Sequence, residues 1–169
     1  KFAIENSTIS GNSGSSGGGL FNSGGSLTLT NSTISGNIGG GLINSFGSTN
    51  YFYCYYDCSR GGTLTLNRSL IAGNQAPVAP EIQNISTVAY ASIVSANNFN
   101  MFGTNGNSGV AGFTPGPTDI VPGVSFAQIL GPLKNNGGTT QTHALVAGSP
   151  AIDAGDPGGC RENPPLTGW

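Results

Sequence analysis

The chain has 169 residues, of which 36% are hydrophobic and 7% are charged, and it contains 29 glycines and 10 prolines. This length fits a single domain, and so small a charged fraction is unlike that of disordered chains, which are rich in charge and poor in apolar residues. The net charge of -2 without any basic run argues against a nucleic-acid partner, and no apolar stretch reaches the roughly 18 residues that a membrane span needs, so no membrane insertion is expected.

The first feature along the chain is the motif Asn-Ser-Thr-Ile-Ser-Gly-Asn at residues 6–12. It recurs unchanged at residues 31–37 and in altered form at residues 68–74. A glycine-rich motif that ends in Leu-Phe-Asn or Leu-Ile-Asn also repeats, at residues 17–22 and 39–44, with a spacing of about 22 residues. Repetition at this period indicates a solenoid, because about 22 residues are too few for a helical hairpin of the tetratricopeptide or ankyrin kind.

Three short strands fill each repeat in this interpretation. Residues 27–30 alternate apolar and polar side chains, which is typical of a strand, and the abundant glycine, asparagine, serine and threonine disfavour helices. With further strands at residues 19–22 and 32–35, the repeats stack into an all-β, right-handed parallel β-helix of about 22 residues per coil. Matching positions then form buried core ladders, whose members are Leu27, Leu29, Ile34, Leu64, Leu66 and Ile71.

A row of asparagines occupies one register of the repeat, at Asn12, Asn37 and Asn74. Asparagine tolerates the left-handed backbone of bends, and its carboxamide can hydrogen-bond the equivalent residue of the next coil. We therefore expect an asparagine ladder at this register. The alternative significance of the repeated asparagines is glycosylation at Asn-X-Ser/Thr sequons. The sequons begin at Asn6, Asn31, Asn67 and Asn84.

A loop insertion at residues 45–60 interrupts the second coil and carries most of the five tyrosines of the chain. Its aromatic residues are Tyr51, Phe52, Tyr53, Tyr55 and Tyr56. One interpretation is a loop folded over one side of the solenoid. The other is a contact patch for a neighbouring chain or for sugar rings, since tyrosine offers a rigid amphipathic face.

The three cysteines are Cys54, Cys58 and Cys160. An odd number of cysteines in an exported protein leaves one thiol free or paired across chains, and we expect Cys54 to pair with either Cys58 or Cys160. Free thiols are the second alternative. A zinc site is the third, although a single histidine in the chain makes a full tetrahedral ligand set hard to assemble.

The strict repeat fades after Asn74. Further strands are expected in looser coils, at residues 80–83, 87–94 and 99–102. Residues 103–117 are rich in glycine, asparagine and proline, which is typical of a loop. The expected organisation is therefore β-helix coils over residues 1–98, followed by a loop-rich capping segment at residues 99–169 that continues the same solenoid.

The C-terminal part carries four recognisable motifs. They are Gly-Pro-Leu at residues 131–133, Asn-Gly-Gly-Thr at 136–139, Thr-His-Ala-Leu at 142–145 and Gly-Ser-Pro-Ala-Ile-Asp-Ala-Gly at 148–155. With these motifs and the Asn-Ser-Thr-Ile coils, the chain resembles bacterial surface β-helix proteins that carry a choice-of-anchor Q domain, and its coils are similar to repeats of polymorphic outer-membrane proteins. The resemblance covers nearly the whole chain and implies export, display at the cell surface and no defined catalytic residues.

Enzyme activity has to be weighed, because many parallel β-helices act on polysaccharides. A lyase of that kind needs acidic calcium ligands and a basic residue on neighbouring coils, and a glycosidase needs paired carboxylates. No coil repeats a carboxylate in register, Asp153 and Asp156 suit a structural cap, and no nucleophile motif accompanies His143. An ice-binding threonine array is disfavoured because Leu70 interrupts the threonine register. We expect no enzyme activity, no cofactor and no metal-binding residues.

The first coil lacks a glycine-rich strand, which places Phe2 and Ile4 at an open solenoid end with unpaired backbone groups. Natural solenoids cap such ends, so either a preceding piece has been removed or another molecule stacks there. A repeated head-to-tail contact builds a filament. We therefore expect a secreted structural protein of the cell surface that associates with itself, with Phe2, Ile4 and Trp169 at the contacting ends. The alternative is a monomeric adhesin or a module that binds surface polysaccharide.

Overall fold

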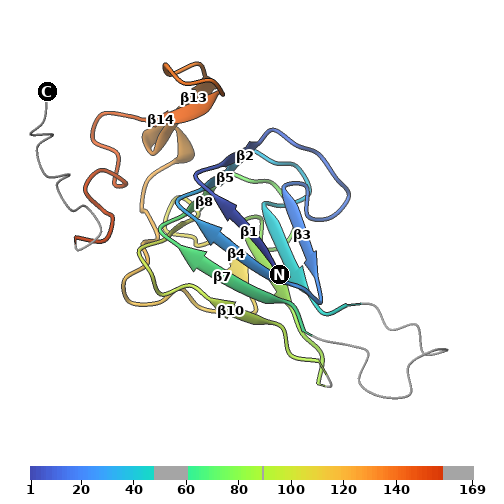
Figure 1. The fold of residues 1–169 in the computed structure, drawn as a ribbon. Coiled ribbons are helices and arrows are strands. Elements are labelled where there is room, and N and C mark those ends of the chain that lie inside the picture. Colours follow the sequence, from blue (N-terminus) through green and yellow to red (C-terminus); the bar gives the residue numbers. More distant parts are fainter. Residues whose placement is uncertain (48–60, 89, 158–169) are drawn as a thin grey trace, which may run out of the picture.

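The computed structural model describes residues 1–47, 61–88 and 90–157, and its body is a stack of β-coils (Figure 1). The first of three parallel four-stranded sheets has the order β1 (Phe2–Glu5), β4 (Ser26–Thr30), β7 (Thr63–Asn67) and β10 (Ile93–Ser95). The second contains β2 (Thr8–Ser10), β5 (Thr33–Ser35), β8 (Leu70–Ala72) and β11 (Met101–Phe102). The third contains β3 (Leu20–Ser23), β6 (Leu42–Ser45), β9 (Ile82–Ile85) and β12 (Val110–Ala111). Successive strands alternate between the sheets, which confirms the predicted parallel β-helix.

The strand registers confirm the predicted core ladders. The six predicted residues are at most 5% exposed and pair strand to strand, as Leu27 with Leu64, Leu29 with Leu66 and Ile34 with Ile71. Because neighbouring residues of a strand point to opposite faces, Thr28 and Thr65 lie outside while the leucines fill the interior. Leu42 and Ile82 of the third sheet and Phe102 of the last coil join the same core. One coil cannot bury these side chains alone, so the fold depends on stacking.

The spacing between stacked residues matches the predicted repeat of about 22 residues between β3 and β6, and it is longer at the other positions compared below. Residues that stack on each other are 22 apart for Asn22 and Asn44. They are 25 apart for Asn12 and Asn37, and 37 apart for Asn37 and Asn74. The longest of these spacings includes the connection between the end of β6 in the third sheet and the start of β7 in the first sheet. The strands on either side therefore keep their register.

The later coils differ in detail from the prediction. Residues 103–117, predicted to be a loop, contain the short strand β12, which pairs in parallel with β9. Gly109 and Gly112 flank β12 with φ of +62° and +80°, a left-handed conformation that glycine adopts without strain. The strand predicted at residues 87–94 is found only at its end, as β10. The parallel coils therefore extend beyond the predicted boundary at residue 98.

The chain then leaves the solenoid path. After a single 3-10 turn at Phe126–Gln128, β13 (Leu130–Lys134) and β14 (Thr142–Leu145) form an antiparallel hairpin that pairs with none of the parallel sheets. It lies beside β2 and β5 in Figure 1. A second hydrophobic cluster, separate from the solenoid core, is built around Met101, Ile129 and Leu130. This part thus covers the side of the coils, whereas the sequence predicted that it continues the solenoid.

Several predicted features fall outside the described residues. These are the aromatic residues 51–56 of the insertion, the cysteines Cys54, Cys58 and Cys160, and Trp169. Within the parts of the chain that the structure describes, no helix is both long enough and apolar enough to cross a membrane.

Candidate functional site

An asparagine ladder follows the strands of the second sheet, as the sequence predicts. Asn12 Nδ2 donates to Asn37 Oδ1 at 3.0 Å, and Asn37 Nδ2 donates to Asn74 Oδ1 at 2.9 Å. The backbone N–H groups of Asn12 and Asn37 donate to the same two oxygens, both at 3.0 Å. The ladder ends on Glu81, whose carboxylate accepts from Asn74 Nδ2 at 2.6 Å and from the Gly73 N–H at 2.9 Å.

Glu81 is a buried carboxyl group at the end of this ladder. Burial raises the pKa of Glu81 above its ordinary value, and the hydrogen bonds from Asn74 and Gly73 oppose that rise. An ionised carboxylate only accepts hydrogen bonds, so Glu81 has no donor to pass to a further coil. The ladder therefore has a direction, and Glu81 terminates it.

A second asparagine ladder, which sequence reasoning missed, follows the third sheet. Asn22 Nδ2 donates to Asn44 Oδ1 at 2.7 Å, and Asn44 Nδ2 donates to Asn84 Oδ1 at 2.8 Å. Asn84 Nδ2 then donates to the Gly112 carbonyl at 3.1 Å. The signal was present in the sequence, because Asn22 and Asn44 each end a copy of the glycine-rich motif.

A third ladder begins with serines and was also missed. The backbone N–H of Ser7 donates to Ser32 Oγ at 3.1 Å, and that of Ser32 donates to Ser69 Oγ at 3.2 Å. Ser69 N–H donates to Asn100 Oδ1 at 3.0 Å, and Asn100 Nδ2 donates to Asp119 Oδ1 at 2.9 Å. This ladder thus runs in the same direction as the first and also ends on a carboxylate.

The corner between the first and second sheets carries one residue per coil with a left-handed backbone. The φ angles are +48° at Asn6, +48° at Asn31, +47° at Arg68 and +53° at Phe99. Each of these residues immediately precedes a member of the serine ladder, so all four share one register. Asparagine adopts this conformation readily, whereas arginine and phenylalanine do so at a cost of roughly 1–2 kcal/mol. The two later coils therefore hold strained residues at this corner.

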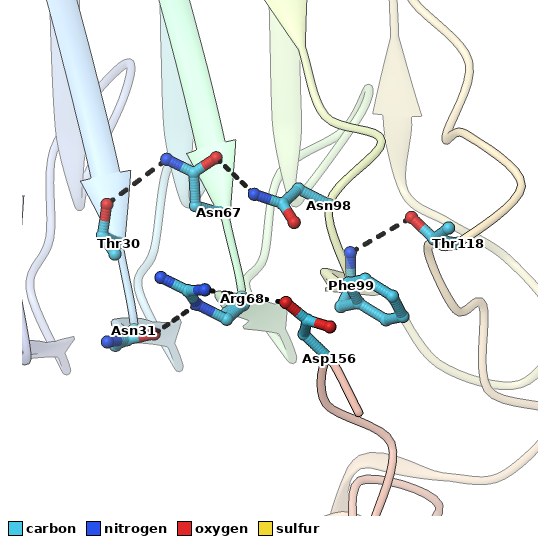
Figure 2. A network of polar contacts seen from close by, with 8 residues as sticks. All are labelled: Thr30, Asn31, Asn67, Arg68, Asn98, Phe99, Thr118 and Asp156. Atoms are coloured by element: carbon cyan, nitrogen blue, oxygen red, sulfur yellow. Dashed lines mark hydrogen bonds and ion pairs between the residues drawn. The ribbon is translucent and has the colours of Figure 1, made fainter. Parts of the chain in front are cut away.

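Figure 2 shows the polar contacts around Arg68. Arg68 Nε donates to Asn31 Oδ1 at 3.1 Å, and Arg68 Nη1 lies 4.0 Å from Asp156 Oδ2. Asp156 comes from the C-terminal segment and lies between Arg68 and Phe99 in this view. Sequence reasoning assigned Asp156 to a structural cap and did not place it against a coil corner.

A second polar row runs beside the first (Figure 2). Asn67 Nδ2 donates to Thr30 Oγ1 at 3.4 Å, and Asn98 Nδ2 donates to Asn67 Oδ1 at 2.8 Å. The Phe99 N–H donates to Thr118 Oγ1 at 3.3 Å. The corner thus presents amide, hydroxyl, guanidinium and aromatic groups side by side.

A pocket of about 140 Å³ lies between this corner and the C-terminal segment. It is lined by Arg68, Ser69, Leu70, Phe99, Asn100, Met101, Ile120, Ala151, Ala154 and Gly155. Four separate segments build it, at residues 68–70, 99–101, 120 and 151–155, and no local motif marks them. The pocket with its polar corner is the candidate functional site.

His143 on β14 joins the hairpin to the second sheet. Its Nδ1 lies 2.7 Å from the Gly131 carbonyl, and since a carbonyl only accepts, Nδ1 carries the proton and donates. Nε2 lies 3.1 Å from Ser10 Oγ and 3.0 Å from Ser35 Oγ, within hydrogen-bond distance of both hydroxyls. Ser35 faces away from the core, yet it is 0% exposed because the hairpin covers it. Both ring nitrogens of His143 are therefore used in holding the hairpin.

Across residues 1–47, 61–88 and 90–157, no three histidine, cysteine, aspartate or glutamate side chains are grouped closely enough to hold a metal ion. Comparisons with protein-family models, curated proteins and solved structures find no match to this chain.

Proposed function

We propose that the protein is a non-catalytic, extracellular structural β-solenoid that associates end to end with further solenoid coils. The open side of the first coil carries the proposal. The strands β1, β2 and β3 each form the edge of their sheet, and their outer N–H and C=O groups can template another strand. Phe2 occupies the same register as the buried Leu27, yet it is 64% exposed because no described strand stacks on it. We call this surface the first-coil face.

The first-coil face also presents hydrogen-bond acceptors. Asn37 Oδ1 accepts two donors from the first coil, whereas the equivalent Asn12 Oδ1 accepts none from the described residues. An incoming coil with amide donors would continue the ladder. At the opposite end, Glu81 and Asp119 only accept, so the ladders stop there. A second copy stacked head to tail would therefore be held by backbone strands and apolar side chains rather than by the ladders.

A structural role also agrees with the use of the titratable groups. Glu81 and Asp119 terminate ladders, and His143 holds the hairpin. Extracellular placement is supported by the resemblance of the repeats and C-terminal motifs to those of bacterial surface β-helix proteins.

Light scattering and negative-stain electron microscopy of the 169-residue chain test this proposal. We expect assemblies larger than a monomer, and we expect Phe2→Lys to convert them to monomers, because an ammonium group would have to lose its hydration at the contact. Val78→Lys is the matched control, since Val78 is 61% exposed and lies in the turn between β8 and β9. Deleting residues 164–169 tests the predicted contribution of Trp169. A monomer at high concentration and physiological salt, or equal association of Phe2→Lys and Val78→Lys, overturns end-to-end association.

A further inference from the structure

At the corner with the left-handed backbone, two successive coils carry a residue other than asparagine. Asn6 and Asn31 occupy this register in the first two coils, but Arg68 and Phe99 replace them, with φ of +47° and +53°. Strained residues of this kind persist where the surrounding structure enforces them, and they cluster at binding sites. Both residues line the pocket of about 140 Å³. The two residues with a strained backbone are therefore also residues of the pocket.

The polar groups around the pocket can form hydrogen bonds with hydroxyl groups of a ligand. Arg68 uses Nε on Asn31, and its guanidinium has further N–H donors. The 4.0 Å between Arg68 Nη1 and Asp156 Oδ2 exceeds the roughly 2.7–3.2 Å of a hydrogen bond. A hydroxyl in the pocket can accept a hydrogen bond from one of these guanidinium donors. Phe99 adds an apolar aromatic surface at the same pocket.

We infer that this pocket binds one neutral hexopyranose unit of a polysaccharide. A pyranose has hydroxyls that both donate and accept, and an apolar C–H face that packs on an aromatic ring. The pocket is smaller than the roughly 300–1,000 Å³ of sites for drug-sized ligands, so it admits a single sugar unit. Asp156 offsets the charge of Arg68 and repels an acidic sugar, which selects a neutral one. The inference does not depend on end-to-end association, so the two experiments fail independently.

Nuclear magnetic resonance of the isotope-labelled chain tests the site with the methyl glycosides of glucose, galactose and mannose. Binding of at least one glycoside, with a Kd on the order of 1–10 mM, should shift the Phe99 N–H and the Arg68 Nε–H resonances. Glucuronate is the charged comparison and should bind more weakly. The inference is overturned if none of the three glycosides shifts these resonances, or if glucuronate binds more tightly than they do.

Variants that restore asparagine at the corner separate binding from stability. Arg68→Asn and Phe99→Asn should each weaken sugar binding by at least about tenfold, because a charge-assisted contact or the aromatic surface is lost. Arg68→Asn should leave the midpoint of thermal unfolding unchanged or raise it, since asparagine suits the left-handed backbone. Ala79→Asn is the matched control, because Ala79 has φ of +44° and is not among the residues that line the pocket. Full affinity in Arg68→Asn, or a lowered midpoint in that variant, contradicts the inference.

Discussion

Replacing Asn37 with alanine measures directly what the ladders contribute to stability. The Asn37 carboxamide is 0% exposed and accepts from the Asn12 N–H and Nδ2. It donates to the Ile9 carbonyl at 3.1 Å and to Asn74 Oδ1 at 2.9 Å. The exposed Asn12 groups are hydrated by water in the variant, and Asn74 Oδ1 keeps the hydrogen bond from the Asn37 N–H, but the Ile9 carbonyl loses the donor Asn37 Nδ2. At about 1 kcal/mol net per hydrogen bond, plus the void, we expect the unfolding free energy to fall by about 2–4 kcal/mol.

Two further variants test the reasoning behind this magnitude. Asn12→Ala removes an exposed member of the same ladder and should cost about 1 kcal/mol or less, because water replaces its contacts. Asn37→Asp keeps an acceptor toward Asn12 but places a second oxygen against the Ile9 carbonyl and Asn74 Oδ1. At neutral pH, Asn37→Asp should therefore destabilise more than Asn37→Ala, because a buried charge is left without a donor on that side.

Urea-induced unfolding followed by far-ultraviolet circular dichroism gives the three free energies. The m-value has to stay constant across the series for the differences to report on the folded state. Equal losses for Asn12→Ala and Asn37→Ala would refute the argument from burial. A variant Asn37→Asp as stable as the unmodified chain would refute the assigned direction of the ladder.

Two more predictions concern the titratable groups. Because the pKa of Glu81 is raised in the folded state, protonated Glu81 adds to the free energy of unfolding. This added stability is fully present below the ordinary pKa of 4.5 and is lost as the pH rises through the raised pKa. The unfolding free energy should thus decline with pH just above 4.5 in the unmodified chain, and this part of the decline should be absent in Glu81→Gln. His143→Ala removes the ring contacts with Ser10 and Ser35, so amide hydrogen exchange should speed up in β13 and β14 and stay slow in β4 and β5. Faster exchange throughout the coils would instead show that the hairpin supports the whole solenoid.

The repeated part of the fold could be predicted from the sequence because its interactions repeat with the motif. Leu29 and Leu66 stack because they occupy the same place in neighbouring coils, and Asn12 and Asn37 meet for the same reason. Alternation of apolar and polar residues decides which side of each strand faces the interior. The ladder of Asn22 and Asn44 follows the same rule and was within reach of the sequence.

The tertiary structure alone decided the features that do not repeat. Glu81 ends a ladder only because the chain returns it to Asn74, and no periodic pattern marks that contact. The meeting of Arg68, Phe99 and Asp156 likewise joins three separate segments at one corner. The antiparallel hairpin covers the second sheet because His143 and the second hydrophobic cluster hold it there. Such contacts depend on the path of the whole chain, whereas the strand pattern and the repeat register follow from short stretches of the sequence.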